Sequence, residues 1–193
     1  MTLANKITLV RILLIPVFVG LALYYAHSVT EGAPDERLRW GAVTVFAVAA
    51  LSDALDGWVA RRYQQHSKLG VILDPLADKL LMLSSVCVLS FSAWPHGLPL
   101  YFVILSISRE VLTIAGAFVI KFVAGKVEIA PHWTGKASTF TQIVAIGAAM
   151  FSLGAVVGDA AALAAVFVVG SGAVYLIDAI RPINAAGHGN ADS

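Results

Sequence analysis

Six long apolar stretches, separated by short polar segments, follow one another along the chain. Each has about the 20 residues that a helix needs to cross the hydrocarbon core of a membrane. Because a spanning helix satisfies its own backbone hydrogen bonds, the pattern predicts an all-α membrane protein, one bundle of six transmembrane helices. The predicted spans are residues 9–26, 38–60, 71–94, 98–122, 134–153 and 160–180. They form one predicted membrane domain over residues 1–181, followed by a disordered polar tail over residues 182–193.

The composition supports a membrane location. Hydrophobic residues make up 59% of the 193 residues and charged residues only 13%, whereas a soluble domain has about 25% charged residues. So few charges cannot cover a soluble surface. The formal net charge of +1 also argues against an electrostatic nucleic-acid binder.

Lysine and arginine are concentrated on alternate flanks of the predicted spans. The richer flanks hold Lys6, Arg11, Arg61, Arg62, Lys68, Lys121, Lys126, Lys136 and Arg181, and the opposite flanks hold Arg37 and Arg39. By the positive-inside rule, both termini are predicted to be cytoplasmic. Asn5, Thr8 and Arg11 recur at every third residue, which predicts an N-terminal interfacial helix that leads into the first span.

The opposite ends of the spans carry aromatic residues and histidines. Because such residues favour the membrane–water interface, an interfacial belt is predicted from Tyr24, Tyr25, His27, Trp94, His96 and Tyr101. In the last span, Gly170 and Gly172 would let two helices approach closely, so they are a candidate surface for a homodimer.

Two pairs of aspartates lie inside the second and third spans, near their cytoplasmic ends. Charge inside a bilayer is costly and marks a functional site by default. Asp53 and Asp56 are three residues apart, and Asp74 and Asp78 are four apart, so each pair shares one helix face. Pro75 favours the first turn of a helix, which puts Asp74 at the very start of the third helix. The short connection makes the two helices antiparallel neighbours, and the two pairs are then predicted to face each other.

Four carboxylates cannot all stay ionised in a low-dielectric site without compensation. Hard divalent cations, which prefer oxygen ligands, would supply it. Two metals bridged by carboxylates are a recurring device for displacement at phosphorus, and Arg61 lies just outside, where it is a candidate phosphate ligand. The pattern therefore predicts metal-assisted phosphoryl chemistry at the boundary between membrane and cytosol.

The aspartates belong to a longer pattern, Asp53-Ala-Leu-Asp56-Gly57-Trp-Val-Ala60-Arg61, then eight residues, then Gly70-Val-Ile-Leu-Asp74-Pro-Leu-Ala-Asp78. At every fixed position, and with the exact spacer, it resembles the signature of the CDP-alcohol phosphatidyltransferase family. The resemblance extends to the six-span plan and to the opening Asn5-Lys-Ile-Thr8-Leu-Val-Arg11, and so covers roughly residues 1–145.

The resemblance implies a site and a mechanism. Two Mg²⁺ or Mn²⁺ ions would be held by Asp53, Asp56 and Asp74, with Asp78 completing the site. Asp78 would also be the general base that takes the proton of the acceptor hydroxyl, and CMP would leave. The pocket for CDP-diacylglycerol would be lined by Gly57, Ala60, Arg61 and Gly70. The enzyme would act on the cytoplasmic side of the cytoplasmic membrane, in phospholipid biosynthesis.

The acceptor is expected to bind near the fourth and fifth spans. Arg109 would reach an anionic acceptor, or it would simply pair with Glu110. Lys136 is either a further ligand or a topology anchor, and Thr139 follows one turn later. Within the family, Arg109-Glu110 and the later Gly135-Lys136-Ala-Ser-Thr139 resemble phosphatidylglycerophosphate synthases, which use glycerol 3-phosphate, although Ser138 replaces a second lysine. Residues 107–118 also resemble cardiolipin synthases, which use phosphatidylglycerol.

A different class of protein also fits clustered intramembrane carboxylates. Cation transporters and proton relays carry such groups along a path across the bilayer. Here both pairs lie near one end of their spans, and a transporter has no need of Gly57, Ala60 and Arg61 at fixed offsets. Release of CMP from a CDP-linked lipid, dependent on Mg²⁺ or Mn²⁺, distinguishes the enzyme from the transporter.

Overall fold

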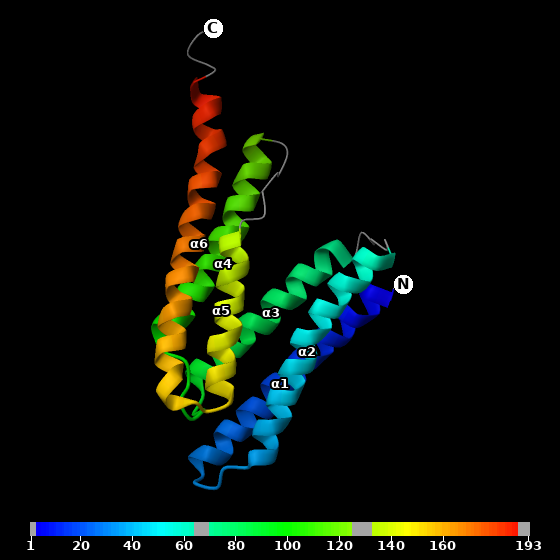
Figure 1. The fold of residues 1–193 in the computed structure, drawn as a ribbon, viewed down its shortest axis with the longest axis vertical. Coiled ribbons are helices and arrows are strands. Elements are labelled where there is room, and N and C mark those ends of the chain that lie inside the picture. The colour runs from blue at the N-terminus through cyan, green and yellow to red at the C-terminus, as the bar shows by residue number, and fades with distance from the viewer. Residues whose placement is uncertain (1–2, 64–69, 125–132, 189–193) are drawn as a thin grey trace. The chain divides into compact units, whose positions relative to one another are not determined.

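The computed structural model contains six α-helices over the residues that it describes, 3–63, 70–124 and 133–188 (Figure 1). Side chains are described for residues 7–52, 73–115 and 133–177. The helices are α1 (Leu3–Thr30), α2 (Glu36–Tyr63), α3 (Gly70–Phe91), α4 (Leu100–Ala124), α5 (Trp133–Met150) and α6 (Gly154–His188). The predicted all-α fold with six helices is confirmed.

Among the described residues, two helical segments are long and apolar enough to cross a membrane, Ile7–Thr30 in α1 and Gly154–Ile177 in α6. Both present large apolar side chains on their outer faces, such as Leu13 and Val166, which are about two-thirds exposed. Such contiguous apolar exposure suits contact with lipid better than contact with water. That the other four helices also cross the membrane stays a prediction.

The N-terminal residues correct one prediction. α1 is a single continuous helix from Leu3 to Thr30, with Pro16 inside it, and the structure has no separate interfacial helix before the first span within the residues described. Thr8 and Arg11 are completely buried, whereas an interfacial helix would turn its polar residues toward water. Thr8 and Arg11 therefore mark a face of α1 that packs inside the protein.

The C-terminal end also differs from the prediction. α6 continues to His188, so the first seven residues of the predicted disordered tail are helical. Ala185 and Ala186 explain the extension, because alanine has the highest helix propensity. Small residues therefore did not by themselves mark the end of the helix.

Contacts group the helices into two compact units. The first comprises Met1–Leu98 and Ile146–Val157, and the second comprises Pro99–Ala145 and Gly158–Ser193. Sequence analysis expected one domain over residues 1–181, and this assignment of a single functional domain stays a prediction.

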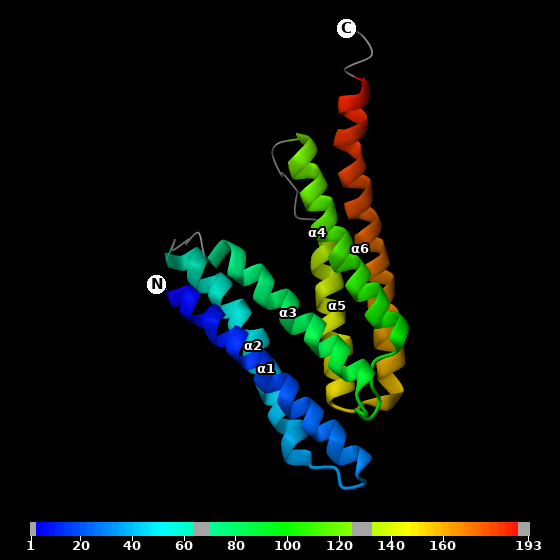
Figure 2. The same cartoon turned by 180° about the vertical axis from the view of Figure 1, so that it is seen from behind.

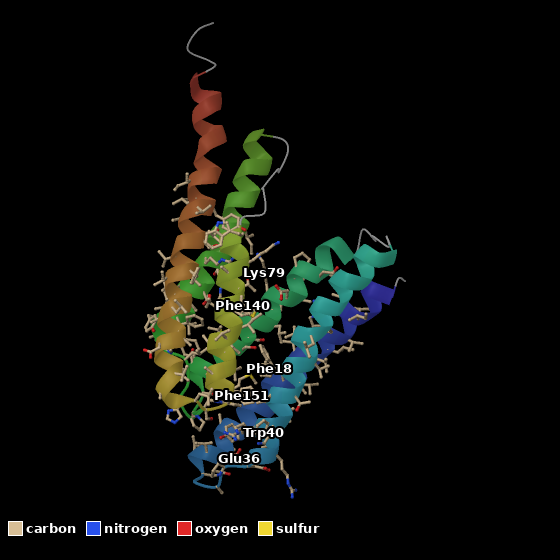
Figure 3. All side chains as sticks on the ribbon, in the orientation of Figure 1. Phe18, Glu36, Trp40, Lys79, Phe140 and Phe151 are labelled. Atoms are coloured by element: carbon tan, nitrogen blue, oxygen red, sulfur yellow. The ribbon has the colours of Figure 1, made fainter. Side chains whose placement is uncertain are left out.

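In the first unit, α1 lies along α2 and also packs against α3 (Figure 1 and Figure 2). Ala22 of α1 and Ala42 of α2 are completely buried, and such small side chains let two helices approach closely. Phe18 packs against Phe46 with ring centroids 5.8 Å apart; Figure 3 labels Phe18. This packing positions α1 beside the helices that carry the aspartates.

Tyr25 and Trp94 correct the predicted interfacial belt. Both are buried in the first unit, where their rings meet edge to face with centroids 4.6 Å apart. The Trp94 Nε1–H donates a 3.0 Å hydrogen bond to the carbonyl of Ala149. A buried indole N–H needs a hydrogen-bond acceptor. Here a backbone carbonyl of the protein is that acceptor, in place of the water or lipid headgroups of a membrane interface. Tyr24 and Tyr101, in contrast, stay exposed.

The residues around Trp94 form a tight corner in the same unit. A Cβ on Gly97 would lie 2.2 Å from the carbonyl oxygen of Leu89, a separation that no side chain tolerates. Glycine is therefore required at position 97, in the segment that follows α3.

Trp40 and Phe151, both labelled in Figure 3, pack in the same unit with ring centroids 5.8 Å apart.

In the second unit, α4 runs beside α6 and most of α5 (Figure 1 and Figure 2). One point of close contact involves all three helices. A Cβ built on Gly135 of α5 would lie 3.1 Å from the Tyr175 hydroxyl of α6 and 3.7 Å from the Arg109 guanidinium of α4. The absence of a side chain at Gly135 therefore lets polar groups from three helices converge.

Candidate functional site

The aspartate pairs lie on two helices of the first unit. Asp53 and Asp56 belong to α2, and Asp74 and Asp78 belong to α3. Continuous helix over both pairs keeps each pair on one face, as their spacing predicts. Several predicted site residues have side chains outside the described ones, so their mutual distances stay predictions: Asp53, Asp56, Gly57, Ala60, Arg61 and Gly70.

The start of α3 corrects the predicted position of Asp74. The helix begins at Gly70, so Asp74 lies in its second turn and Pro75 lies inside the helix. A proline lacks the N–H that would bond to the carbonyl four residues earlier. Only about one turn precedes Pro75, so the missing bond falls near the helix end, where unpaired backbone groups occur anyway.

Thr8 of α1 binds directly to one of the predicted metal ligands. Its hydroxyl donates a 2.5 Å hydrogen bond to Oδ1 of Asp74. Thr8 is completely buried, while Asp74 is half-buried. The bond joins two helices far apart in sequence and orients the Asp74 carboxylate. This role of Thr8 was not predicted from the sequence, although the repeat of Asn5, Thr8 and Arg11 was the signal that could have revealed it.

Arg11, one turn after Thr8, brings a positive charge to the same region. Its guanidinium is completely buried, and Nε donates a 3.3 Å hydrogen bond to the hydroxyl of Ser52. Ser52 in turn donates to the carbonyl of Ala49 and immediately precedes Asp53 in α2. Because burying an ion is costly unless polar groups surround it, the completely buried Arg11 depends on partners inside the protein, and Ser52 is one of them.

Asp78 and Lys79 follow on α3, one turn beyond Asp74. Both side chains are half-buried, and both take part in polar interactions within the protein (Figure 3 labels Lys79). Lys79, next to Asp78 in sequence, brings a positive charge to this part of α3.

A second group of polar side chains lines a groove in the second unit. The groove has a volume of about 470 Å³ and is lined by Arg109, Gly135, Lys136, Thr139, Phe140, Ile143 and Tyr175. Three residues predicted to bind the acceptor, Arg109, Lys136 and Thr139, are thus brought together by α4 and α5. Tyr175 of α6 was not predicted; its signal was a tyrosine within a largely apolar segment.

Of the two interpretations that the sequence left open for Arg109, the structure shows the pairing with Glu110, and binding of the acceptor stays a prediction. Its Nη1 lies 2.5 Å from Oε1 of Glu110, and both side chains are nearly buried. The ion pair holds only one edge of the guanidinium. Nη2 points toward Gly135, and the buried Nε has no hydrogen-bond partner among the described residues. Arg109 is therefore both anchored by Glu110 and able to bind a further anion.

The other two polar residues of the groove differ in what they offer a ligand. Lys136 is exposed on the first turn of α5 and presents an ammonium group. Thr139 donates its hydroxyl proton to the carbonyl of Gly135 at 3.1 Å. The Thr139 oxygen keeps its lone pairs, so it can accept a hydrogen bond from a hydroxyl group of a ligand.

The aspartates have the chemistry of a magnesium or manganese site. All four donors are carboxylate oxygens, which hard divalent cations prefer over nitrogen or sulfur. Within the side chains that the structure describes, no group of three His, Cys, Asp or Glu residues comes together. The side chains of Asp53 and Asp56 lie outside the described ones, so the distances within the full group of four aspartates stay predictions. The chemistry of the four carboxylates fits such an ion.

Comparisons with known proteins identify a family and several relatives. The sequence model described as CDP-alcohol phosphatidyltransferase matches residues 1–174. A probable phosphatidylglycerophosphate synthase of Mycobacterium tuberculosis is 34% identical over 186 residues, which are 94% of this chain and 83% of the relative. A CDP-diacylglycerol–glycerol-3-phosphate 3-phosphatidyltransferase of Bacillus subtilis is 35% identical over 150 residues, 76% of this chain and 75% of the relative. A CMP-forming cardiolipin synthase of Streptomyces coelicolor is 34% identical over 167 residues, 86% of this chain and 72% of the relative.

Proposed function

Because the chain belongs to the CDP-alcohol phosphatidyltransferase family, we propose that it makes phosphatidylglycerophosphate by transferring the phosphatidyl group of CDP-diacylglycerol to glycerol 3-phosphate. The observation that carries the choice of acceptor is the groove in which Arg109 and Lys136 converge. Two cationic side chains suit an acceptor that carries a phosphate group. The names of the relatives from Mycobacterium tuberculosis and Bacillus subtilis support the same reaction.

The metal site would be formed by Asp53, Asp56, Asp74 and Asp78. When bound, one or two divalent ions of Mg²⁺ or Mn²⁺ would neutralise the charge that develops on the diphosphate of the CDP-lipid. Thr8 would hold the Asp74 carboxylate in place through its hydrogen bond. The nucleotide and phosphate pocket would be completed by residues around the two pairs: Gly57, Ala60, Arg61 and Gly70.

The reaction exchanges one phosphorus–oxygen bond for another. The acceptor hydroxyl oxygen attacks the phosphorus that bears the diacylglycerol, and the bond from that phosphorus to the CMP oxygen breaks. Asp78 takes the proton of the attacking hydroxyl, and CMP leaves with the electron pair of the broken bond. Asp78 suits this role because it is half-buried and lies one turn further into α3 than Asp74.

The acceptor would lie along the groove of the second unit. Arg109 and Lys136 would bind its phosphate, while the Thr139 oxygen would accept a hydrogen bond from one of its hydroxyl groups. Glu110 would keep the Arg109 guanidinium in position through their ion pair.

The protein would act as an integral enzyme of the cytoplasmic membrane. All six helices would span the bilayer, both termini would be cytoplasmic, and the active site would face the cytoplasm. The excess of lysine and arginine on alternate flanks supports this orientation. A homodimer through Gly170 and Gly172 is a further expectation.

A second candidate function is the synthesis of cardiolipin from phosphatidylglycerol. The relative from Streptomyces coelicolor favours it, because that protein is named a cardiolipin synthase and is 34% identical over 86% of this chain. Both acceptors carry phosphate, so Arg109 and Lys136 suit either. Glycerol 3-phosphate is preferred because its phosphate monoester carries more negative charge.

The test is an acceptor panel. Purified protein is incubated with CDP-diacylglycerol, Mg²⁺ or Mn²⁺, and in turn glycerol 3-phosphate, phosphatidylglycerol, serine or inositol phosphate, and the lipid product is identified by mass spectrometry. We expect CMP release and phosphatidylglycerophosphate with glycerol 3-phosphate. If product forms only with another acceptor, glycerol 3-phosphate is not the substrate, but the proposed phosphatidyl transfer still holds. Movement of divalent ions across liposomes without CMP release would favour the transporter instead.

A further inference from the structure

We infer that the Tyr175 hydroxyl is a third donor for the acceptor phosphate, beside Arg109 and Lys136, and that it selects a phosphate monoester over a phosphodiester. The inference rests on the proposed function and adds to it a residue of α6. It makes Tyr175 a residue that determines substrate specificity.

The geometry around Gly135 places the donors. A Cβ at that position would be 3.1 Å from the Tyr175 Oη and 3.7 Å from the Arg109 Nη2. The hydroxyl and the guanidinium therefore lie on the same side of Gly135, in the groove that Lys136 also lines. One phosphate group in this position would be within reach of donors from α4, α5 and α6.

The polar atoms at this point need a partner. The structure shows no hydrogen bond from the Tyr175 hydroxyl within the part of the chain that it describes, and Arg109 Nε is buried without one. The hydroxyl of Thr134, one residue before Gly135, is also buried without a partner among the described residues. Burying polar groups costs free energy unless they are hydrogen-bonded. An anion in the groove would give Arg109 and the Tyr175 hydroxyl a partner, near the positive end of the α5 dipole.

Gly135 keeps this position open. Glycine lowers helix propensity relative to alanine, yet it stands in the first turn of α5. Its backbone conformation is ordinary, because no positive φ is recorded for it. The available reason for glycine is therefore space: a methyl group would press on the Tyr175 hydroxyl and approach Arg109.

The number of hydrogen-bond donors in the groove determines whether a phosphate monoester or a phosphodiester binds better. A monoester such as glycerol 3-phosphate presents three terminal oxygens, each of which accepts hydrogen bonds, and carries nearly two negative charges at neutral pH. A phosphodiester such as phosphatidylglycerol presents two terminal oxygens and one charge. Arg109, Lys136 and Tyr175 together match three oxygens, so the loss of one donor should weaken monoester binding more.

The experiment compares Tyr175→Phe with a matched control, Tyr101→Phe, which removes an exposed hydroxyl outside the groove. Steady-state rates are measured in detergent micelles, with inorganic phosphate as a competitive inhibitor. For Tyr175→Phe we expect the KM for glycerol 3-phosphate and the inhibition constant of phosphate to rise about 10-fold, the value of a hydrogen bond to a charged group. The KM for CDP-diacylglycerol should change less than about two-fold, and Tyr101→Phe should match the wild type.

A double-mutant cycle tests the contact itself. Gly135→Ala should raise the KM for glycerol 3-phosphate, because its methyl group displaces the Tyr175 hydroxyl. In the Tyr175→Phe background that atom is gone, so Gly135→Ala should have a smaller additional effect. Additive effects, or an unchanged KM and phosphate inhibition in Tyr175→Phe, would overturn the inference.

Failure of the inference is separable from failure of the proposed function. If the wild type makes phosphatidylglycerophosphate and Tyr175→Phe behaves like it, only the role of Tyr175 is wrong. If the wild type uses phosphatidylglycerol in place of glycerol 3-phosphate, the proposed function and the selection of a monoester are both wrong.

Discussion

The two polar regions of the molecule hold their charged groups in different ways. In the first unit, Thr8 and Arg11 are completely buried and bond across helices, Thr8 to Asp74 and Arg11 to Ser52. In the second unit, Arg109 takes its ion-pair partner from the adjacent position in its own helix, and its remaining donors face a groove.

The difference indicates which region is organised before substrate binds. The hydrogen bond from Thr8 orients the Asp74 carboxylate without help from a ligand, as the proposed role of Asp74 in metal binding requires. Arg109 is held at one edge only, so its other donors stay available for a small anionic molecule. We therefore expect substitutions in the first region to reduce turnover, and substitutions in the second to weaken acceptor binding.

The largest expected effects come from the aspartates. Asp74→Asn should lower kcat about 10³-fold or more, because a metal ligand contributes several kcal/mol to stabilising the transition state.

Asp78→Asn should lower kcat about 10²- to 10⁴-fold, the range for general-base catalysis, while it binds CDP-diacylglycerol normally. Turnover is followed by CMP release, and lipid binding by equilibrium titration of the CDP-lipid. Normal turnover in Asp78→Asn would remove it as the base.

Next comes Arg109→Gln, which keeps a polar side chain but removes its charge. The KM for glycerol 3-phosphate should rise about 10- to 100-fold, since a hydrogen bond to a charged group contributes about 1.5–3 kcal/mol. The KM for CDP-diacylglycerol should stay near the wild-type value. Arg39→Gln is the matched control, because Arg39 lies outside the groove and pairs with Glu36. A fall in kcat without any change in KM would contradict the expectation that substitutions in the second region weaken acceptor binding.

The smallest of the three effects is expected for Thr8→Val, which removes the hydroxyl that binds Asp74. The concentration of Mn²⁺ needed for half-maximal activity should rise about 10-fold, as is typical of groups that orient metal ligands. Mn²⁺ affinity, measured by electron paramagnetic resonance without substrate, should fall in parallel, and Thr8→Ser should restore both. Thr44→Val is the control, because the Thr44 hydroxyl bonds only to the helix backbone at Trp40. Unchanged Mn²⁺ affinity in Thr8→Val would show that the hydrogen bond is merely structural.

Much of this architecture was predictable because it depends on local pattern. Helix number follows from apolar stretches of sufficient length, and the spacing within Asp53–Asp56 and Asp74–Asp78 sets which residues share a face. The errors fall where packing overrides local pattern. Tyr25 and Trp94 have the composition of an interfacial belt, yet Trp94 finds its hydrogen-bond partner at Ala149, 55 residues away. Polar spacing in α1 suggested an interface because exposure to water and burial against polar partners produce the same pattern.

The sequence by itself determined the family, the aspartate pairs and the presence of Arg109 and Lys136 in the predicted acceptor region, because these depend on residue identity and on spacing along one helix. Only the tertiary structure decided which residues support them. Thr8 and Asp74 are 66 residues apart, and Tyr175 meets Gly135 and Arg109 from a different helix. Contacts between helices depend on how each helix is rotated and packed. The periodicity of a single helix contains no information about its partner.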